Sequence, residues 1–346
     1  MKRLYSLDFL KLVFAYVIAC FHFGRTIAPG PTVTVQIFFF ISGFFLARKY
    51  YARSHADGGI RYTPWNYTLD HVKGIYPHYV FGYAAYLLYE TARTAGEMLR
   101  SPSLEQVREV IVSFYDQIPN LLFLQSAYHF HDNRNYPLWQ LSALVIGGYF
   151  VYTLLCHNER LSRQLIFPAG ILMVLSLRHS GIDLDGTFGF FYMPLLRAFC
   201  GLSFGALVYF FTTTPYYETV KKNRILWNLA VLLAPVCIFA FAEHANIHFV
   251  TGAVLILGCF DERSWLNRLL NHKIFRHCGK LSLSIYINHA LICRFTQGFL
   301  FSRLESRGLL TGESSRFAAY LVILTVYSVI TMTVIDAWCR RRKTTA

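Results

Sequence analysis

Long apolar runs constrain this chain more than any other feature of its sequence. An α-helix needs roughly 17 to 25 mostly apolar residues to cross the roughly 30 Å of hydrocarbon in a bilayer. The chain has about ten candidate runs, near 9–24, 33–50, 76–93, 138–156, 164–178, 189–211, 225–242, 246–260, 281–301 and 317–338. We therefore expect an all-α, polytopic membrane helical bundle with about ten transmembrane helices.

The composition agrees with burial in lipid. Of 346 residues, 55% are hydrophobic and only 15% are charged, against roughly 25% charged in an average soluble domain. This excludes an ordinary soluble enzyme, and so much apolar surface also excludes a disordered chain. The eight cysteines show no Cys-x-x-Cys or Cys/His ligand spacing, so we interpret them as buried apolar residues.

The net charge of +14 could mark a nucleic-acid surface or the cytoplasmic loops of a membrane protein. With both termini placed inside, 21 of the 33 Lys and Arg residues fall on inner segments, nine on outer segments and three within spans. This is the positive-inside pattern. Topology thus accounts for the charge without nucleic acid, and both termini are predicted to be cytoplasmic.

The spans leave no room for a separate soluble domain, so we expect one integral membrane domain over residues 1–346. The long connections are 51–75 inside and 94–137 outside. The outer one carries the helix-start signal Ser101-Pro102-Ser103, which predicts one or two short amphipathic helices over the outer mouth. Met1-Lys2-Arg3 before an apolar run also fits a signal peptide, but no small-x-small cleavage site follows.

Ionisable residues inside the spans are candidate functional residues, because such side chains usually face a cavity or a partner. The first span holds Asp8, Lys11 and His22. Asp8 and Lys11 have the spacing of a local ion pair. Asp8 and His22 share a helix face but lie about 21 Å apart along the axis, too far for a direct dyad. His22 has two interpretations, a proton acceptor near neutral pH or an ordinary hydrogen-bonded histidine.

Small residues in two other spans predict close approach of helices. Ser42-Gly43 lies among phenylalanines and admits either a neighbouring helix or a thin ligand. Gly201 and Gly205 have the Gly-x-x-x-Gly spacing of close helix packing. Arg197, just before them, needs an anionic or carbonyl partner.

Two basic or polar runs complete the candidates. His71 and Lys73 precede the third span and are either a phosphate site or ordinary positive-inside charges. His289 lies in a run rich in hydroxyls that suits a polar pocket. His129 and His131 have a spacing that could touch a metal, but a solvated outer loop explains them better.

The order of these motifs resembles the membrane-bound acyltransferase 3 family. The resemblance covers nearly the whole chain and rests on five stretches: Leu7-Asp8-Phe9-Leu10-Lys11 with His22, Phe38 to Phe44, Ile75-Tyr76-Pro77, Pro137 to Leu144, and Gly279 to His289. It implies a roughly ten-helix bacterial inner-membrane protein. Such a protein takes an acyl group, usually acetyl, from cytoplasmic acyl-CoA and transfers it to a hydroxyl of a cell-surface or secreted glycan.

The resemblance also implies residue roles. His22 matches the catalytic histidine of the first helix, and Asp8 matches the acidic residue at the start of that helix. Lys11 stands where the family usually has Arg, and His71-Val72-Lys73-Gly74 stands in place of Arg-x-x-Arg. The residues expected to contact substrate are Lys11, Ser42, Gly43, His71, Lys73, Trp139, Arg197, Tyr286 and His289.

The partners expected from the resemblance are the acyl-CoA donor, a hydroxyl acceptor and membrane lipid, with no metal or further cofactor. The expected mechanism has His22 as general base on the acceptor hydroxyl. The acceptor, the acyl chain length and the oligomeric state stay open. A transporter of an acylated or anionic small molecule is the alternative, since Arg197, His289 and Arg294 could line a transport path. A catalytically inactive assembly partner is the third.

Overall fold

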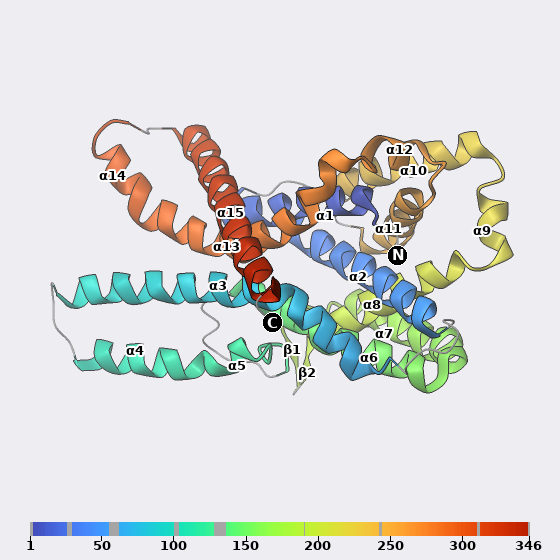
Figure 1. Ribbon diagram of the computed structural model, residues 1–346, viewed down its shortest axis with the longest axis horizontal. Coiled ribbons are helices and arrows are strands. Elements are labelled where there is room, and N and C mark those ends of the chain that lie inside the picture. The colour runs from blue at the N-terminus through green and yellow to red at the C-terminus, as the bar shows by residue number, and fades with distance from the viewer. Residues whose placement is uncertain are drawn as a thin grey trace.

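The structure, a computed structural model, describes residues 3–25, 30–54, 62–99, 104–127, 136–189, 191–241, 244–309 and 312–344. Nearly all of these residues are helical, which confirms the all-α class (Figure 1). The strands in these ranges are β1 (Thr187–Phe188) and β2 (Phe191–Tyr192), which pair antiparallel with Thr187 opposite Tyr192 and Phe188 opposite Phe191.

The helices follow one another along the chain with short connections. They are α1 (Tyr5–His22), α2 (Gly30–Ser54), α3 (Pro64–Met98), α4 (Leu104–Asp116), α5 (Ile118–Leu121), η1 (Tyr136–Leu138), α6 (Trp139–Leu161), η2 (Ser162–Ile166), α7 (Phe167–His179), α8 (Met193–Phe211), α9 (Pro215–Val220), α10 (Arg224–Ala240), α11 (Ala245–Phe260), α12 (Trp265–Leu270), η3 (Lys273–His277), α13 (Cys278–Phe295), η4 (Thr296–Leu300), α14 (Phe301–Glu305) and α15 (Glu313–Thr344).

Five helical stretches of the described chain are long and apolar enough to cross a membrane. They are α1, α2, the run Trp139–His179 formed by α6, η2 and α7, then α8, and Glu313–Arg342 of α15. Helices α10 and α11 are apolar but shorter. A multi-pass membrane bundle is therefore supported, while the count of ten spans and the cytoplasmic termini stay predictions.

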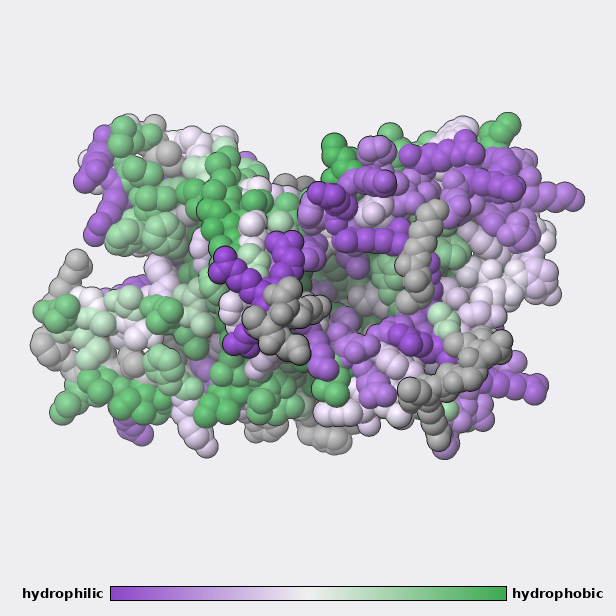
Figure 2. Space-filling model, viewed as in Figure 1, coloured by the Kyte–Doolittle hydropathy of each residue, from purple (hydrophilic) through white to green (hydrophobic). Residues whose placement is uncertain are grey.

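The surface agrees with the predicted orientation. Figure 2 shows hydrophilic surface gathered over the end of the molecule that carries α9 and α12 in Figure 1, whereas apolar surface gathers over α3, α4 and α15. The predicted inner segments 212–224 and 261–280 include α9 and α12. The charged end is thus the one predicted to face the cytoplasm.

Helix α2 runs through the centre of the bundle and packs most closely on α8. A Cβ added to Gly43 would collide with the backbone of Leu202, and one added to Gly205 would collide with the backbone of Phe40. A Cβ on Gly201 would lie 2.5 Å from that of Phe39. The close packing predicted from the Gly-x-x-x-Gly spacing is confirmed.

The inner connection differs from the prediction, because α3 begins at Pro64 and residues 64–75 are helical. The Thr63 side chain accepts a hydrogen bond from the Asn66 amide at 3.2 Å, and Pro64 occupies the first turn. These are standard helix-start signals. The hydropathy scan missed them because it detects lipid-compatible segments and not helicity.

The outer connection contains the two short helices that were predicted, α4 and α5, but they do not only cover the outer mouth. Helix α4 runs back alongside α3 (Figure 1), so that α5 lies against the middle of α3. The Tyr79 hydroxyl donates to the Asn120 carbonyl at 2.6 Å and accepts from Gln125 at 2.8 Å, and the Tyr83 hydroxyl accepts from the Asn120 amide at 3.1 Å. Buried polar groups need such partners, and these partners lie inside the bundle.

Candidate functional site

A cavity of about 190 Å³ lies between α1, α2, α3, α6 and α13. Its polar lining consists of Lys11, Ser42, His71, Gln140, Ser282 and Tyr286, and apolar side chains complete the wall. All five sequence stretches that carry the family resemblance contribute to this lining. Segments far apart in the chain are therefore brought together at one place.

Lys11 supplies a positive charge in this cavity. Its Nζ lies 4.9 Å from the centre of the Phe45 ring. The expected ion pair with Asp8 is not among the salt bridges of the described residues, so that prediction is wrong. Asp8 packs against Gly279 at the start of α13 and pairs with Arg3 at 2.7 Å instead. Placed at a helix N-terminus, the carboxylate also has a favourable electrostatic environment. Lys11 has no carboxylate within ion-pair distance among the described residues.

Two further cavity residues have polar atoms that make no hydrogen bond within the described chain. His71 Nε2 and Gln140 Oε1 are buried and have no hydrogen-bond partner in the described chain. His71 stacks on Tyr67, with ring centres 6.1 Å apart. An unpaired buried polar group costs on the order of 1–3 kcal/mol, so such atoms are expected where a ligand supplies the missing partner.

The charges beside the cavity are already compensated. Lys49 Nζ lies 3.0 Å from Asp70 Oδ2. A hydrogen bond from Tyr62, and then one from Lys49, lowers the pKa of Asp70, which keeps this carboxyl ionised. Lys73 is exposed and does not line the cavity. Lys11 is thus the cation best placed to meet an anionic group inside the cavity.

Two histidines lie farther along the same helices. The rings of His22 and His289 stack with centres 5.0 Å apart and planes 18° apart. His289 is fully buried, its Nδ1 lies 2.7 Å from the Tyr286 carbonyl, and its Nε2 has no partner in the described chain. His22 is only partly buried, and its backbone carbonyl accepts from Cys293 Sγ at 3.2 Å. A partly open imidazole next to a buried one can accept a proton from a group that approaches from outside.

Tyr286 links the cavity to the histidines. It lines the cavity, its ring centre lies 5.8 Å from that of His289, and its hydroxyl donates to the Pro137 carbonyl. Ser282, Tyr286 and His289 recur at spacings of four and three residues, which places them on one helix face. The polar face of α13 therefore runs without a break from the cavity to the histidine pair.

The face of α1 that packs on α13 carries its candidate residues in the same order along the helix. Asp8 contacts Gly279, and His22 contacts His289 and Cys293. The predicted common face of Asp8 and His22 is confirmed as the face that packs on α13. The two residues contact opposite ends of α13, and no direct pair forms between them.

Other candidates lie outside the cavity. Gly43 packs on α8, and the Trp139 ring lies 6.4 Å from that of Phe39. Arg197 is only 2% exposed and binds Asp185, the Thr32 carbonyl and, at 3.2 Å, Gln36 Oε1. The predicted need of Arg197 for an anionic or carbonyl partner is confirmed.

The three residues of the transport alternative contact different groups in the described structure. Arg197 lies with Asp185 near the start of α2, and His289 lies with His22. Arg294 is exposed, with Nε 4.0 Å from Glu90. Each of the three has its own surroundings.

Sequence reasoning missed Gln140 and Ser282 as site residues. Both lie within stretches that carry the resemblance, which was the available signal. No group of three or more potential metal ligands occurs among the described residues. His129 and His131 lie outside the described residues.

The fold and the site define an integral, multi-pass, all-α membrane protein with a mainly apolar cavity that six polar side chains also line. Residues 4–337 match the acyltransferase 3 family, described as an acyltransferase domain, and the chain belongs to that family. No curated protein and no solved structure matches the chain.

Proposed function

We propose that this acyltransferase moves an acyl group, acetyl in the simplest case, from cytoplasmic acyl-CoA to a hydroxyl of a cell-surface or secreted glycan. The observation that carries the proposal is the continuous polar face from the Lys11 cavity through Tyr286 to the histidine pair. Membership of an acyltransferase family supports the class of reaction.

The donor would enter the cavity from the side predicted to be cytoplasmic. Lys11 and His22 are eleven residues apart, or about 16 Å along the helix. A thin, extended arm is needed to cover that distance, and the pantetheine arm of acyl-CoA has this shape. Lys11, His71 and Gln140 would hold polar groups of the donor, while the thioester reaches past Tyr286 toward His22. The exposed Lys73 would attract the donor phosphates from outside the cavity.

His22 would act as the general base. The acceptor hydroxyl gives its proton to the imidazole as its oxygen attacks the thioester carbonyl. The new carbon–oxygen bond forms, the carbon–sulfur bond breaks, and the imidazolium returns the proton to the leaving thiolate of CoA. His289, stacked on His22, fixes the ring that carries the proton and is a positioning residue. Asp8 would support the donor side through Arg3, since it lies far from the histidines.

Acyl-CoA turnover by purified protein in nanodiscs tests the proposal. Radiolabelled acetyl-CoA is supplied with and without an extract of cell-surface glycans, and free thiol and labelled glycan are measured. We expect His22→Ala to lower kcat by about 10² to 10⁴-fold, the range of general acid–base catalysis. His157→Ala, at an exposed position outside the site, is the matched control and should leave turnover unchanged.

The proposal fails if folded protein gives no thiol release with several acyl-CoA donors, or if His22→Ala turns over as well as the parent protein. Thiol release that does not depend on any glycan extract would overturn the acceptor class and keep the donor.

A further inference from the structure

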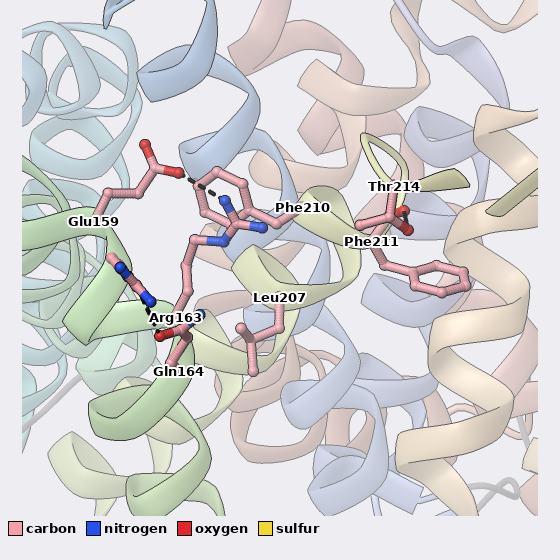
Figure 3. Close-up of a pocket in the computed structure, with 8 residues that line it drawn as sticks. Glu159, Arg163, Gln164, Leu207, Phe210, Phe211 and Thr214 are labelled. Atoms are coloured by element: carbon pink, nitrogen blue, oxygen red, sulfur yellow. Dashed lines mark hydrogen bonds and ion pairs between the residues drawn. The ribbon is translucent and has the colours of Figure 1, made fainter. Parts of the chain in front are cut away.

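A second recess lies away from the central cavity, where η2 meets the end of α8. It measures about 460 Å³, within the roughly 300–1,000 Å³ typical of ligand pockets. Figure 3 shows Glu159, Arg163 and Gln164 on one wall, facing the α8 end across the recess. Arg160 also lines the recess. The residues on the α8 side are Leu207, Phe210, Phe211 and Thr214.

A break in helical geometry shapes the basic wall. Asn158 has non-helical dihedral angles (φ −155°, ψ 95°), and its side chain accepts from the Leu161 amide at 2.9 Å. The π-helix η2 begins four residues later, at Ser162. Single-turn π-helices are rare and are frequent at functional sites. Arg160 and Arg163, on either side of this junction, line the same recess.

The two arginines keep hydrogen-bond donors free. Arg163 donates from Nη1 to Glu159 at 2.7 Å, and its guanidinium lies 4.2 Å above the Phe210 ring. Arg160 donates from Nε to Gln164 at 3.2 Å and has no carboxylate partner in the described structure. Each guanidinium carries five N–H donors. Two arginines and one glutamate leave the recess with a net positive charge and several N–H groups for an anion.

The rest of the surroundings is apolar and in part exposed. Leu207 and Phe211 line the recess, and Leu161 and Leu165 on the same turn are 43% and 60% exposed. Tyr216, just beyond α8, is 70% exposed, as expected of an aromatic side chain at the membrane–water boundary. Segments 157–163 and 212–224 are both predicted to lie inside, so the recess is at the level of the cytoplasmic headgroups.

We propose that this recess binds one anionic glycerophospholipid of the cytoplasmic leaflet. Its phosphate accepts N–H bonds from Arg160 and Arg163, as basic pockets between transmembrane helices do. Gln164 and the Thr214 hydroxyl face the polar headgroup, and the acyl chains follow Leu207 and Phe211. A soluble phosphate would leave this apolar wall unused, and a zwitterionic headgroup would bring its own cation close to Arg160.

Native mass spectrometry of the purified full chain tests the proposal, with titrations of phosphatidylglycerol, phosphatidylcholine, glycerol 3-phosphate and coenzyme A. We expect phosphatidylglycerol to bind about tenfold more tightly than phosphatidylcholine, because both lipids offer the phosphate but only phosphatidylcholine places a headgroup cation close to Arg160. Arg160→Gln should weaken phosphatidylglycerol binding by about tenfold and leave phosphatidylcholine binding unchanged. Lys222→Gln removes one charge from an exposed position on the same side and should change neither.

A second variant protects the test against misfolding. Thr214→Trp fills the recess without removing charge and should also abolish the preference for phosphatidylglycerol. The proposal is overturned if Arg160→Gln and Lys222→Gln weaken binding equally, which would indicate diffuse attraction. It is also overturned if both Arg160→Gln and Thr214→Trp bind as the parent does, or if glycerol 3-phosphate or coenzyme A binds as tightly as the lipid and with the same dependence on Arg160.

Discussion

At the scale of single residues, the proposed site contains a few buried polar atoms without hydrogen-bond partners in the described chain. Lys11 faces the cavity because Asp8, its expected partner, is held by Arg3 and by the start of α13. His289 has its Nδ1 occupied by the Tyr286 carbonyl, and its Nε2 is free of partners in the described chain. Buried polar groups without hydrogen-bond partners lower the free energy of unfolding. A bound substrate that supplies those partners offsets this cost.

Lys11→Met should raise KM for acyl-CoA by about tenfold or more, because a charge-assisted hydrogen bond contributes on the order of 1.5–3 kcal/mol. Lys11→Arg should restore part of the affinity, since it keeps the charge with a different geometry. Steady-state kinetics with Lys222→Met, at an exposed position outside the proposed donor site, as the control gives the comparison. Equal effects at Lys11 and at Lys222 would argue against a donor site in the cavity.

His289→Gln should lower kcat by about tenfold or more while KM for acyl-CoA stays within about twofold, because the ring that stacks on His22 is lost. His289→Phe retains a stacked ring and should be less impaired. The kcat and KM values of both variants are the measurement. A rise in KM with an unchanged kcat would place His289 in donor binding and remove its role beside His22.

At the scale of elements, two helix pairs position the site. Helix α1 packs on α13 along its whole length, from the Asp8–Gly279 contact to the His22–His289 stack. Helix α2 packs on α8 through glycines and carries Ser42 to the cavity. Gly43 therefore serves the site indirectly, because close approach of α2 to α8 fixes the depth at which Ser42 lies.

Gly43→Ala should destabilise the protein by about 1–3 kcal/mol, since the added methyl meets the Leu202 backbone, which cannot rotate away. Gly96→Ala in α3 is the matched control, because nothing lies within 4 Å of its added Cβ. That change should be neutral or slightly stabilising. Thermal unfolding in detergent checks both variants, and equal melting temperatures would contradict the close α2–α8 contact.

At the scale of the whole molecule, the charge distribution sets the orientation. The hydrophilic end in Figure 2 carries α9 and α12 (Figure 1), which belong to predicted inner segments. In the proposed function, the acceptor would approach His22 from the opposite end of the bundle. The proposed acyl transfer therefore depends on the orientation of the protein in the membrane.

Cysteine labelling tests the orientation in a variant whose exposed or partly exposed cysteines are replaced by Ser, namely Cys156, Cys237, Cys278 and Cys339. A membrane-impermeant maleimide added to intact cells should label Ser180→Cys, on the predicted outer side, and should label Lys222→Cys only after lysis. The two positions are both exposed, so that accessibility reports the side of the membrane. Labelling in the reverse order would invert the topology and with it the entry side of the donor.

The sequence by itself determined the membrane class, the all-α fold, the family and the face shared by Asp8 and His22. These follow from local periodicity, hydropathy and motif order, which need no knowledge of neighbouring helices. It did not predict the helical start at Pro64 or the return of α4 along α3, because capping and buried tyrosine contacts carry no hydropathy signal.

Only the tertiary structure decided how the site is assembled. In the structure, five distant stretches line one cavity, and Gln140 and Ser282 also line it. Asp8 pairs with Arg3 and not with Lys11. The tertiary structure also separated Arg197 and Arg294 from the histidine pair. The physical reason is that a side chain's partner in a helical bundle is chosen by which helix packs beside it, and helix packing depends on contacts between residues far apart in the chain.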